Sequence, residues 1–517
     1  MPLHSFYFLA LFLPLAVAVH FLLTKAGHFR LAVAGLVSLS LAFCGWRGLS
    51  DAEILMGSIC INFLIALLLR RQAGQPGPKQ TFFLALGITV NLSLLAYCKY
   101  SAFVVENVNA LLHTTYPVLT TYLPIGISFL TFQQIAYLTD VYRGQVKTFN
   151  FLDYCFVCSF FPKLLAGPIV RHAEVVPQIA QSMRMLSHEA LAAGATRFTI
   201  GLFKKVVLAD TLAGYATPLF AADTIARDPG MVEAWGGILA YTFQLYFDFS
   251  GYTDMAIGIA QLFGISLPEN FNSPYKATSI TDFWKRWHMT LSRFLRDYVY
   301  IPLGGNRQGP TRQYFNLLLT MMLCGLWHGA SWTFVIWGTL HGAYLLVNHG
   351  WRRLALPCPP TIGWGITFLS VAFAWAWFRA DSVSAAIRLT TSLSGLNGLW
   401  ENGFREALRY LELPAPQLDA LARFFDHDMG FVIRVGHWTI YPANMLFSTP
   451  LLQTFWLVVS GLIVLRFPNA SEWMHPSPKN SESLFSLRRA LVVGGLLFLV
   501  WLASITSQTS GFIYENF

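Results

Sequence analysis

One imidazole in this sequence has surroundings suited to proton transfer. His328 lies in the apolar run CGLWHGASWTF, between Trp327 and Gly329. An aromatic wall on one side and a residue without a side chain on the other leave room for a substrate beside the ring. Burial favours the neutral, proton-accepting form of histidine, as a general base needs for attack by a hydroxyl on a thioester. A hydrogen-bonded structural histidine is the alternative for His328, as it is for His341.

A second histidine, His288, lies within a run of cations that extends from Asp282 to Gly309. On a helical wheel, aromatic side chains fill one arc and cations the other, which predicts an amphipathic interfacial helix with His288 at the border. Such a helix binds lipid headgroups or, with the backbone amides of 304–306, a phosphate-bearing donor. The donor-binding candidates are Lys285, Arg286, Arg293, Arg296, Asn306 and Arg307.

Two carboxylates, Asp248 and Asp254, lie six residues apart in an apolar segment. On a continuous helix they are separated by about 240° and do not share a face. Gly251 between them is compatible with a broken helix. Charged groups at membrane depth mark candidate functional positions, and hydrogen bonding to neighbouring spans is the alternative.

The elements that must hold these groups are membrane spans. The chain has 517 residues, of which 55% are hydrophobic and 12% charged, whereas soluble domains are about 25% charged. Apolar runs near the length of a membrane-spanning helix recur from Phe6 to Ser504. We predict an all-α polytopic protein with about eleven spans, plus re-entrant or interfacial helices near 119–137, 190–209, 279–300 and 383–399. Within it, 234–247 and 253–263 are predicted as separate spans, and 316–347 as one broken span or a tight pair.

Basic residues predict the orientation. The formal net charge of +9 fits lysine and arginine in cytoplasmic loops, so it does not indicate a nucleic-acid partner. The alternation of basic loops places both termini outside, together with the polar loop of about 401–444 and the tail 506–517. That loop is too short for an independent enzyme domain, so residues 1–517 are predicted to form a single integral membrane domain.

The usual sequence motifs of several enzyme classes are missing from this sequence. The chain contains no GxSxG elbow, GxxxxGK[ST] loop, HExxH or His-x4-Asp pattern. Serine hydrolases, P-loop pumps, zinc proteases and glycerolipid acyltransferases are therefore disfavoured. No metal site and no permanently bound cofactor are predicted.

Five blocks together resemble the membrane-bound O-acyltransferase superfamily, in its bacterial branch of polysaccharide O-acetyltransferases that includes the alginate O-acetyltransferase membrane subunit. They cover most of the family-like core of about 120–345. The blocks are LPIGISFLTFQQIAYLTDVYRG (123–144), FFPKLLAGPIVRH (160–172), LYFDFSGYTDMAIG (245–258), FWKRWHMTLSRFLRDYVYIPLGGNRQG (283–309) and GLWHGASWTFVIWGTLHG (325–342).

The resemblance implies a ring of tilted helices around a central tunnel. It implies that His328 is the catalytic histidine and His288 its partner, and that acetyl passes outward from cytoplasmic acetyl-CoA. Candidate tunnel-lining residues are Trp284, Trp287, Trp327, Asp248 and His341. The tail 511–517, GFIYENF, is similar to an ending of this branch in which a tyrosine receives the acyl group, so Tyr514 is a candidate acyl carrier. A disordered terminus is the alternative.

The sequence therefore predicts a bacterial inner-membrane O-acetyltransferase for an exported polysaccharide. Alginate is the first expectation, with cellulose or peptidoglycan open. Membrane lipids, a polysaccharide synthesis machinery and an external SGNH/GDSL-type acetyltransferase are the expected partners. Two alternatives have other functions: a transporter or flippase for a lipid-linked or anionic substrate, using Asp248 and Asp254, and a non-catalytic scaffold of a polysaccharide synthesis complex.

Overall fold

The computed structural model describes residues 2–72, 77–118, 121–181, 188–226, 228–398, 433–435, 438–440, 450–474, 486–506 and 512–513. The described part of the chain is helical apart from loops and one short antiparallel hairpin, in which Ile433 pairs with Ile440. The hairpin strands are β1 (Ile433–Val435) and β2 (Trp438–Ile440). The rest of the polar loop 401–444 lies outside the described residues.

The helices of the first half run from η1 to α12. They are η1 (Phe8–Phe12), α1 (Leu13–Lys25), α2 (Phe29–Cys44), α3 (Leu49–Arg71), α4 (Pro78–Leu95), η2 (Ala96–Tyr100), α5 (Ser101–Leu112), α6 (Ile127–Tyr142), α7 (Phe151–Ser159), α8 (Phe161–Leu164), α9 (His172–Gln181), α10 (His188–Phe203), η3 (Lys204–Ala209), α11 (Asp210–Ala216), η4 (Thr217–Phe220) and α12 (Ala222–Ala226).

The helices of the second half run from α13 to α25. They are α13 (Met231–Leu262), η5 (Pro274–Lys276), α14 (Ile280–Arg286), α15 (Met289–Leu295), η6 (Arg296–Tyr300), α16 (Gly309–His328), α17 (Trp332–Arg353), α18 (Pro360–Arg379), α19 (Val383–Leu393), α23 (Pro450–Arg466), α24 (Ala470–Met474) and α25 (Leu487–Thr506).

Several helices have the length and composition of membrane spans. Among the described residues, five are long and apolar enough to cross a bilayer. They are Phe8–Lys25, Leu49–Arg71, Pro78–Leu112, Pro360–Arg379 and Leu487–Ser504. Large apolar side chains such as Leu491, Phe498 and Trp501 are exposed on α25, as expected for a surface that faces lipid. The molecule is a multi-pass membrane protein, and the total of about eleven spans stays a prediction.

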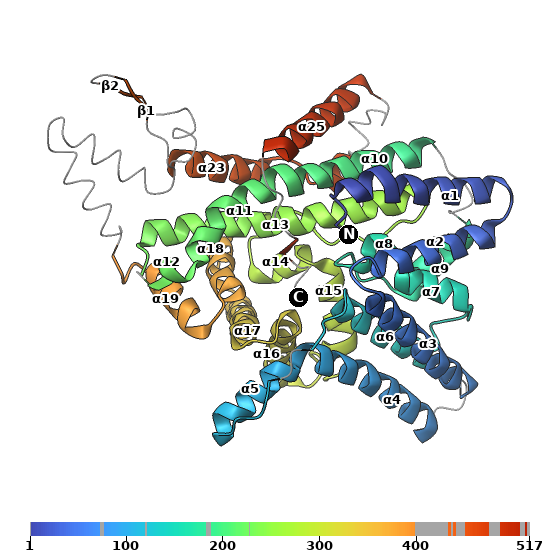
Figure 1. The fold of residues 1–517 in the computed structure, drawn as a ribbon. Helices are drawn as coiled ribbons and strands as arrows, with labels where there is room; N and C mark the ends of the chain where they lie inside the picture. The colour runs from blue at the N-terminus through green and yellow to red at the C-terminus, as the bar shows by residue number, and fades with distance from the viewer. Residues whose placement is uncertain are drawn as a thin grey trace.

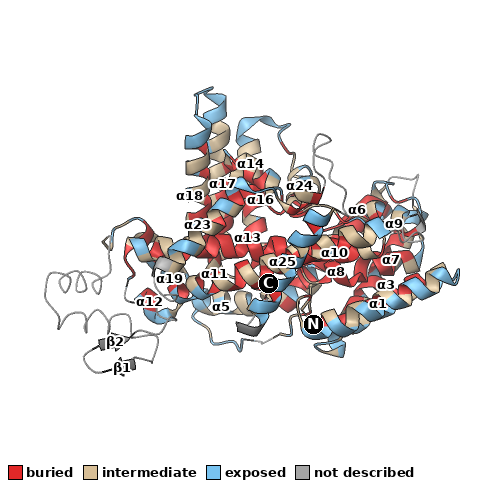
Figure 2. Cartoon of the chain, turned by 90° about the horizontal axis from the view of Figure 1, so that it is seen from above, coloured by how far each residue is buried: buried red, intermediate tan, exposed pale blue. Residues whose placement is uncertain are grey.

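The long helix α13 forms the centre of the fold and packs along α10 (Figure 1). The two backbones come close because both helices carry glycine at the contact: a Cβ atom added to Gly201 would lie 2.5 Å from the carbonyl oxygen of Gly251. Small residues allow such close helix packing in membranes. Buried residues are concentrated along this pair, and exposed ones lie toward the periphery (Figure 2).

Two predictions about helix continuity are wrong. Residues 231–262 form one unbroken helix, so Gly251 serves packing against α10 rather than a break. The segment predicted as one interfacial helix is instead divided into α14, α15 and η6, with His288 at the first break. These short helices lie in the middle of the molecule, with α13, α16 and α6 around them (Figure 1).

Candidate functional site

The α16–α17 hairpin positions His328. Helix α16 ends at His328, and α17 begins four residues later at Trp332. The helices touch at Gly325 and Gly338: a Cβ atom on Gly338 would lie 2.2 Å from the carbonyl oxygen of Met321. The prediction of a tight helix pair in this region is therefore confirmed, and its close packing fixes the end of α16 that carries His328.

The His328 ring is enclosed by aromatic side chains. It is 2% exposed, and its ring centroid lies 4.8 Å from Trp327, 5.2 Å from Trp337 and 5.2 Å from Phe378. The expectation that Gly329 leaves room for a substrate is wrong, because a Cβ atom there would lie 2.1 Å from the ring of Phe334. The Phe334 ring occupies the space beside Gly329 in which a substrate was expected.

A lysine that was not among the predicted site residues holds the end of α16. Lys99, in the π-helical turn η2, donates hydrogen bonds to the carbonyl oxygens of Trp327 at 2.6 Å and His328 at 3.1 Å. Tyr100 donates to the carbonyl oxygen of Leu326 at 2.7 Å. A cation suits the negative end of the helix dipole, and π-helical turns often occur at functional sites. A charged residue within an apolar run was the available signal.

His288 lies at the break between α14 and α15. Its backbone adopts φ 42° and ψ 55°, the left-handed conformation, which non-glycine residues rarely adopt. The side chain is fully buried, and its ring lies 4.9 Å from Phe249 and 6.4 Å from Trp327. Because Trp327 also contacts His328, the structure brings both predicted histidines to the same tryptophan.

His341 and Trp284 join the same aromatic cluster through Trp337. His341 is fully buried, with its ring 5.2 Å from Trp284 and 4.8 Å from Trp337. Among the described residues, neither ring nitrogen of His341 nor the indole nitrogens of Trp284 and Trp337 has a hydrogen-bond partner. Buried polar atoms without partners are uncommon and costly. Trp287 is also buried, with its ring 5.2 Å from that of Trp375.

The carboxylates at 248 and 254 belong to two separate ion clusters, in agreement with their predicted separation on α13. Asp248 pairs with Lys205 at 2.9 Å, and Lys205 also pairs with Asp210 at 2.8 Å. Asp254 pairs with Arg197 at 3.0 Å and Lys204 at 2.7 Å. Both carboxylates are thus paired with basic side chains, which disfavours their use as a transport pathway.

The end of the chain reaches Asp248. The backbone N–H of Ile513 donates to Asp248 Oδ2 at 2.8 Å, and the Phe512 ring stacks on Tyr252 at 4.7 Å. Phe512 also lies 6.2 Å from Phe249, the residue whose ring contacts His288. Tyr514 itself lies outside the described residues.

Most of the predicted donor-binding cations are already paired. Arg286 binds Asp282 at 2.9 Å, Arg293 binds Glu174, and Arg296 binds Asp297 at 2.7 Å. Burial raises the pKa of Asp297, but hydrogen bonds from Arg296 and Arg171 outweigh burial and hold that pKa below its ordinary value. Lys285, Asn306 and Arg307 are exposed. Within the described ranges, neither Lys285 nor Arg307 has an ion-pair partner.

A cavity of about 650 Å³ opens between α17 and α18, within the usual size of small-molecule sites. Its lining includes Tyr344, Asn348, Arg352 and Thr367. The Tyr344 ring lies 5.7 Å from His341. Ring contacts therefore continue from the cavity through His341 and Trp337 to His328. No local sequence pattern predicts this cavity, because its walls come from separate helices.

Comparison with known proteins shows the class of this molecule. Residues 79–384 match the MBOAT, membrane-bound O-acyltransferase family. The chain belongs to this family and is a membrane-bound O-acyltransferase, as its sequence resemblance predicted.

Its relatives come from several polymer-modifying systems. The chain is 42% identical to the peptidoglycan O-acetyltransferase of Helicobacter pylori, over 76% of this chain and 79% of the relative. It is 42% identical to the probable alginate O-acetylase AlgI of Azotobacter vinelandii, over 75% of this chain and 76% of that protein. It is 29% identical to the teichoic acid D-alanyltransferase of Streptococcus thermophilus, over 44% of this chain and 57% of that protein.

Proposed function

We propose that this enzyme moves acetyl groups from cytoplasmic acetyl-CoA across a bacterial inner membrane for the O-acetylation of an exported polysaccharide. The observation that carries the proposal is the convergence of His288 and His328, both buried, on Trp327. The names of the relatives support acetyl as the group and a polymer as its destination. Alginate remains the first expectation, with peptidoglycan and cellulose as alternatives.

The donor reaches the site from the cavity beside Arg352. Basic residues favour the cytoplasmic side of a membrane, and α17 ends in Arg352 and Arg353 next to this cavity. The amide groups of the pantetheine arm would supply hydrogen-bond partners to the nitrogens of His341, Trp337 and Trp284, which the free protein leaves buried without any among its described residues. The exposed cations Lys285 and Arg307 would hold the phosphates of the donor.

In the chemical step, a hydroxyl oxygen attacks the thioester carbonyl carbon of acetyl-CoA. His328 takes the hydroxyl proton, a C–O ester bond forms, the C–S bond breaks, and the CoA thiolate leaves with that proton. His288, whose ring lies 6.4 Å from Trp327, assists as a hydrogen-bonding partner. CoA stays on the cytoplasmic side.

The tail supplies the first acceptor. Tyr514 directly follows Ile513, which is bound to Asp248. The Phe512 ring stacks on Tyr252 and lies 6.2 Å from the ring of Phe249. The phenolic oxygen of Tyr514 receives the acetyl group and passes it to an external SGNH-type partner, which acetylates the polymer. Both termini face the periplasm in this arrangement, and membrane lipids surround the helices.

The test is the replacement of His328 by alanine. Polymer acetylation is measured in cells at equal protein abundance, with the exposed Lys79→Ala variant as the control. A positioned general base contributes about 10²- to 10⁴-fold to rate, so acetylation should fall to background. Undiminished acetylation in His328→Ala would contradict the proposed role.

A further inference from the structure

Asn270 is a buried asparagine that holds the His288 ring. It is fully buried in the loop between α13 and η5. Its Oδ1 atom lies 3.2 Å from His288 Nδ1, 2.7 Å from Thr290 Oγ1 and 3.3 Å from Thr290 N. A single side-chain oxygen therefore faces three groups of the α14–α15 break.

The orientation of the Asn270 amide follows from these contacts. The backbone N–H of Thr290 can only donate, so the atom that faces it must be the amide oxygen rather than the NH₂ group. Flipping the amide would place its NH₂ group, a donor, against the Thr290 backbone N–H, another donor. The Thr290 backbone N–H therefore fixes the orientation of the Asn270 amide, because this group can only donate.

The tautomer of His288 follows in turn. A carbonyl oxygen accepts and cannot donate, so His288 Nδ1 must carry the proton. In the neutral ring Nε2 then holds the free lone pair. Nε2 is buried and has no hydrogen-bond partner within the described part of the chain. The ring is prepared to accept a proton or a hydrogen bond through that nitrogen.

The backbone around Asn270 fixes the same geometry. Met289 N donates to the carbonyl oxygen of Asn270 at 2.9 Å, and Asn272 N donates to that of Arg286 at 2.9 Å. The loop thus pairs with both sides of His288. These bonds hold the left-handed His288 backbone, and strained residues of this kind persist only where their surroundings determine them.

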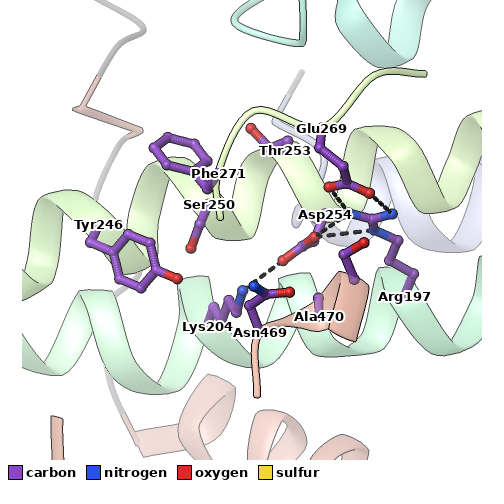
Figure 3. A pocket seen from close by; sticks show the side chains of 11 residues that line it. Arg197, Lys204, Tyr246, Ser250, Thr253, Asp254, Glu269, Phe271, Asn469 and Ala470 are labelled. Atoms are coloured by element: carbon purple, nitrogen blue, oxygen red, sulfur yellow. Dashed lines mark hydrogen bonds and ion pairs between the residues drawn. The ribbon is translucent and has the colours of Figure 1, made fainter. Parts of the chain in front are cut away.

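An ion cluster formed by Glu269, Arg197, Asp254 and Lys204 holds one end of the loop. Glu269, next to Asn270, forms two hydrogen bonds with the Arg197 guanidinium, one of them 2.7 Å long. The same guanidinium binds Asp254, which also binds Lys204 at 2.7 Å. Figure 3 shows Arg197 between the two carboxylates, with Lys204 on the far side of Asp254. Asn469 holds the other end of the loop through Asn272, at 3.1 Å.

We infer that Asn270 is a positioning residue, which fixes the His288 tautomer with Nε2 unprotonated and directs that nitrogen to the reaction. The inference rests on the proposed function. It goes beyond the histidine pair by assigning the acceptor nitrogen of His288 and the group that selects it. The ion cluster of Arg197, Lys204, Asp254 and Glu269 supports this position of Asn270 by holding Glu269, the neighbouring residue of the loop.

The test compares three variants of the full-length chain in lipid nanodiscs. Asn270→Leu keeps the approximate size and removes the acceptor, whereas Asn270→Asp keeps an acceptor at the same place. Asn62→Leu is the matched control, because Asn62 is also buried and hydrogen-bonded to an asparagine, Asn91, at 3.2 Å, away from the histidines. CoA release from acetyl-CoA is measured per folded protein, across the pH range in which histidine titrates.

Asn270→Leu should lower kcat about 10- to 100-fold with little change in KM, part of the contribution of a positioned base. Asn270→Asp should restore most of kcat. A carboxylate beside Nδ1 stabilises the protonated ring, so the acid limb of its profile should move to higher pH. Asn62→Leu should lose stability but keep kcat. The inference is overturned if Asn270→Leu keeps kcat, or if Asn270→Asp is as inactive as Asn270→Leu. His328→Ala separates the two proposals, since its activity alone decides the proposed function.

Discussion

The ammonium group of Lys99 lies 3.1 Å from the carbonyl oxygen of His328, so a residue 229 positions away in sequence holds the end of the helix that carries this histidine. Lys99 also binds the carbonyl oxygen of Trp327 and the hydroxyl of Ser128. The Lys99 side chain thus donates hydrogen bonds to three groups from other helices. No local sequence pattern predicts these contacts.

Lys99→Met should lower both stability and activity. The variant keeps the length of the side chain but leaves two carbonyl groups of α16 without their charged donor, which costs about 1.5–3 kcal/mol per hydrogen bond to a charged group. Thermal unfolding in detergent and CoA release check this expectation. Lys79→Met, at an exposed position on α4, is the control, and equal behaviour of the two variants would contradict the role of Lys99.

Gly338→Ala should loosen the α16–α17 hairpin. The added methyl group would lie 2.2 Å from the carbonyl oxygen of Met321, so the helices must separate and His328 must move. Overpacking of this kind costs about 1–3 kcal/mol. On the same helix, a methyl group on Gly350 meets nothing within 4 Å. Gly350→Ala should therefore leave the unfolding temperature and activity unchanged or slightly raised, and a neutral Gly338→Ala would show that the contact is not needed.

Asp254→Asn should destabilise the protein strongly. It leaves the buried Arg197 and the largely buried Lys204 without their shared carboxylate, and breaking a buried ion pair on one side costs about 3–5 kcal/mol. The control is Asp228→Asn, because Asp228 forms a half-exposed pair with Arg388 and such surface pairs contribute little. Thermal unfolding measures both. A stable Asp254→Asn protein would instead favour a functional carboxylate, as the transporter hypothesis required.

Local sequence predicted the groups of this site better than their geometry. The apolar run around 328 indicated a buried histidine, and His328 is buried. His288, predicted at the border of an amphipathic interfacial helix, is fully buried instead. The break at His288 could not be predicted, because the wheel assumes a continuous helix and the break is held by Asn270 from a distant loop. The helix break predicted at Gly251 was wrong for a related reason. A glycine in a helix can break the helix or permit close packing, and the close contact of Gly251 with Gly201 on α10 shows that it permits packing.

Ser370→Trp should weaken donor binding. Ser370 lines the cavity between α17 and α18, and an indole there would fill space that the donor needs. KM for acetyl-CoA should rise several-fold, while kcat at saturation stays close to that of the unsubstituted enzyme, because only binding is affected. Leu369→Trp places the same side chain on the neighbouring, 51% exposed position and should leave KM unchanged. An unchanged KM in Ser370→Trp would remove this cavity from the path of the donor.

Phe512→Ala should lower polymer acetylation several-fold without lowering the amount of protein. The Phe512 ring stacks on Tyr252 at 4.7 Å, and together with the Ile513 hydrogen bond to Asp248 it holds this segment of the tail near Phe249. Losing the ring weakens this attachment, so Tyr514 reaches the acetyl group less often. Tyr514→Phe removes the accepting hydroxyl and should abolish acetylation. Phe498→Ala, at a 58% exposed position of α25, controls for the loss of a phenylalanine from the C-terminal segment. If Phe512→Ala acetylates as well as Phe498→Ala, attachment of the tail at this place does not serve the reaction.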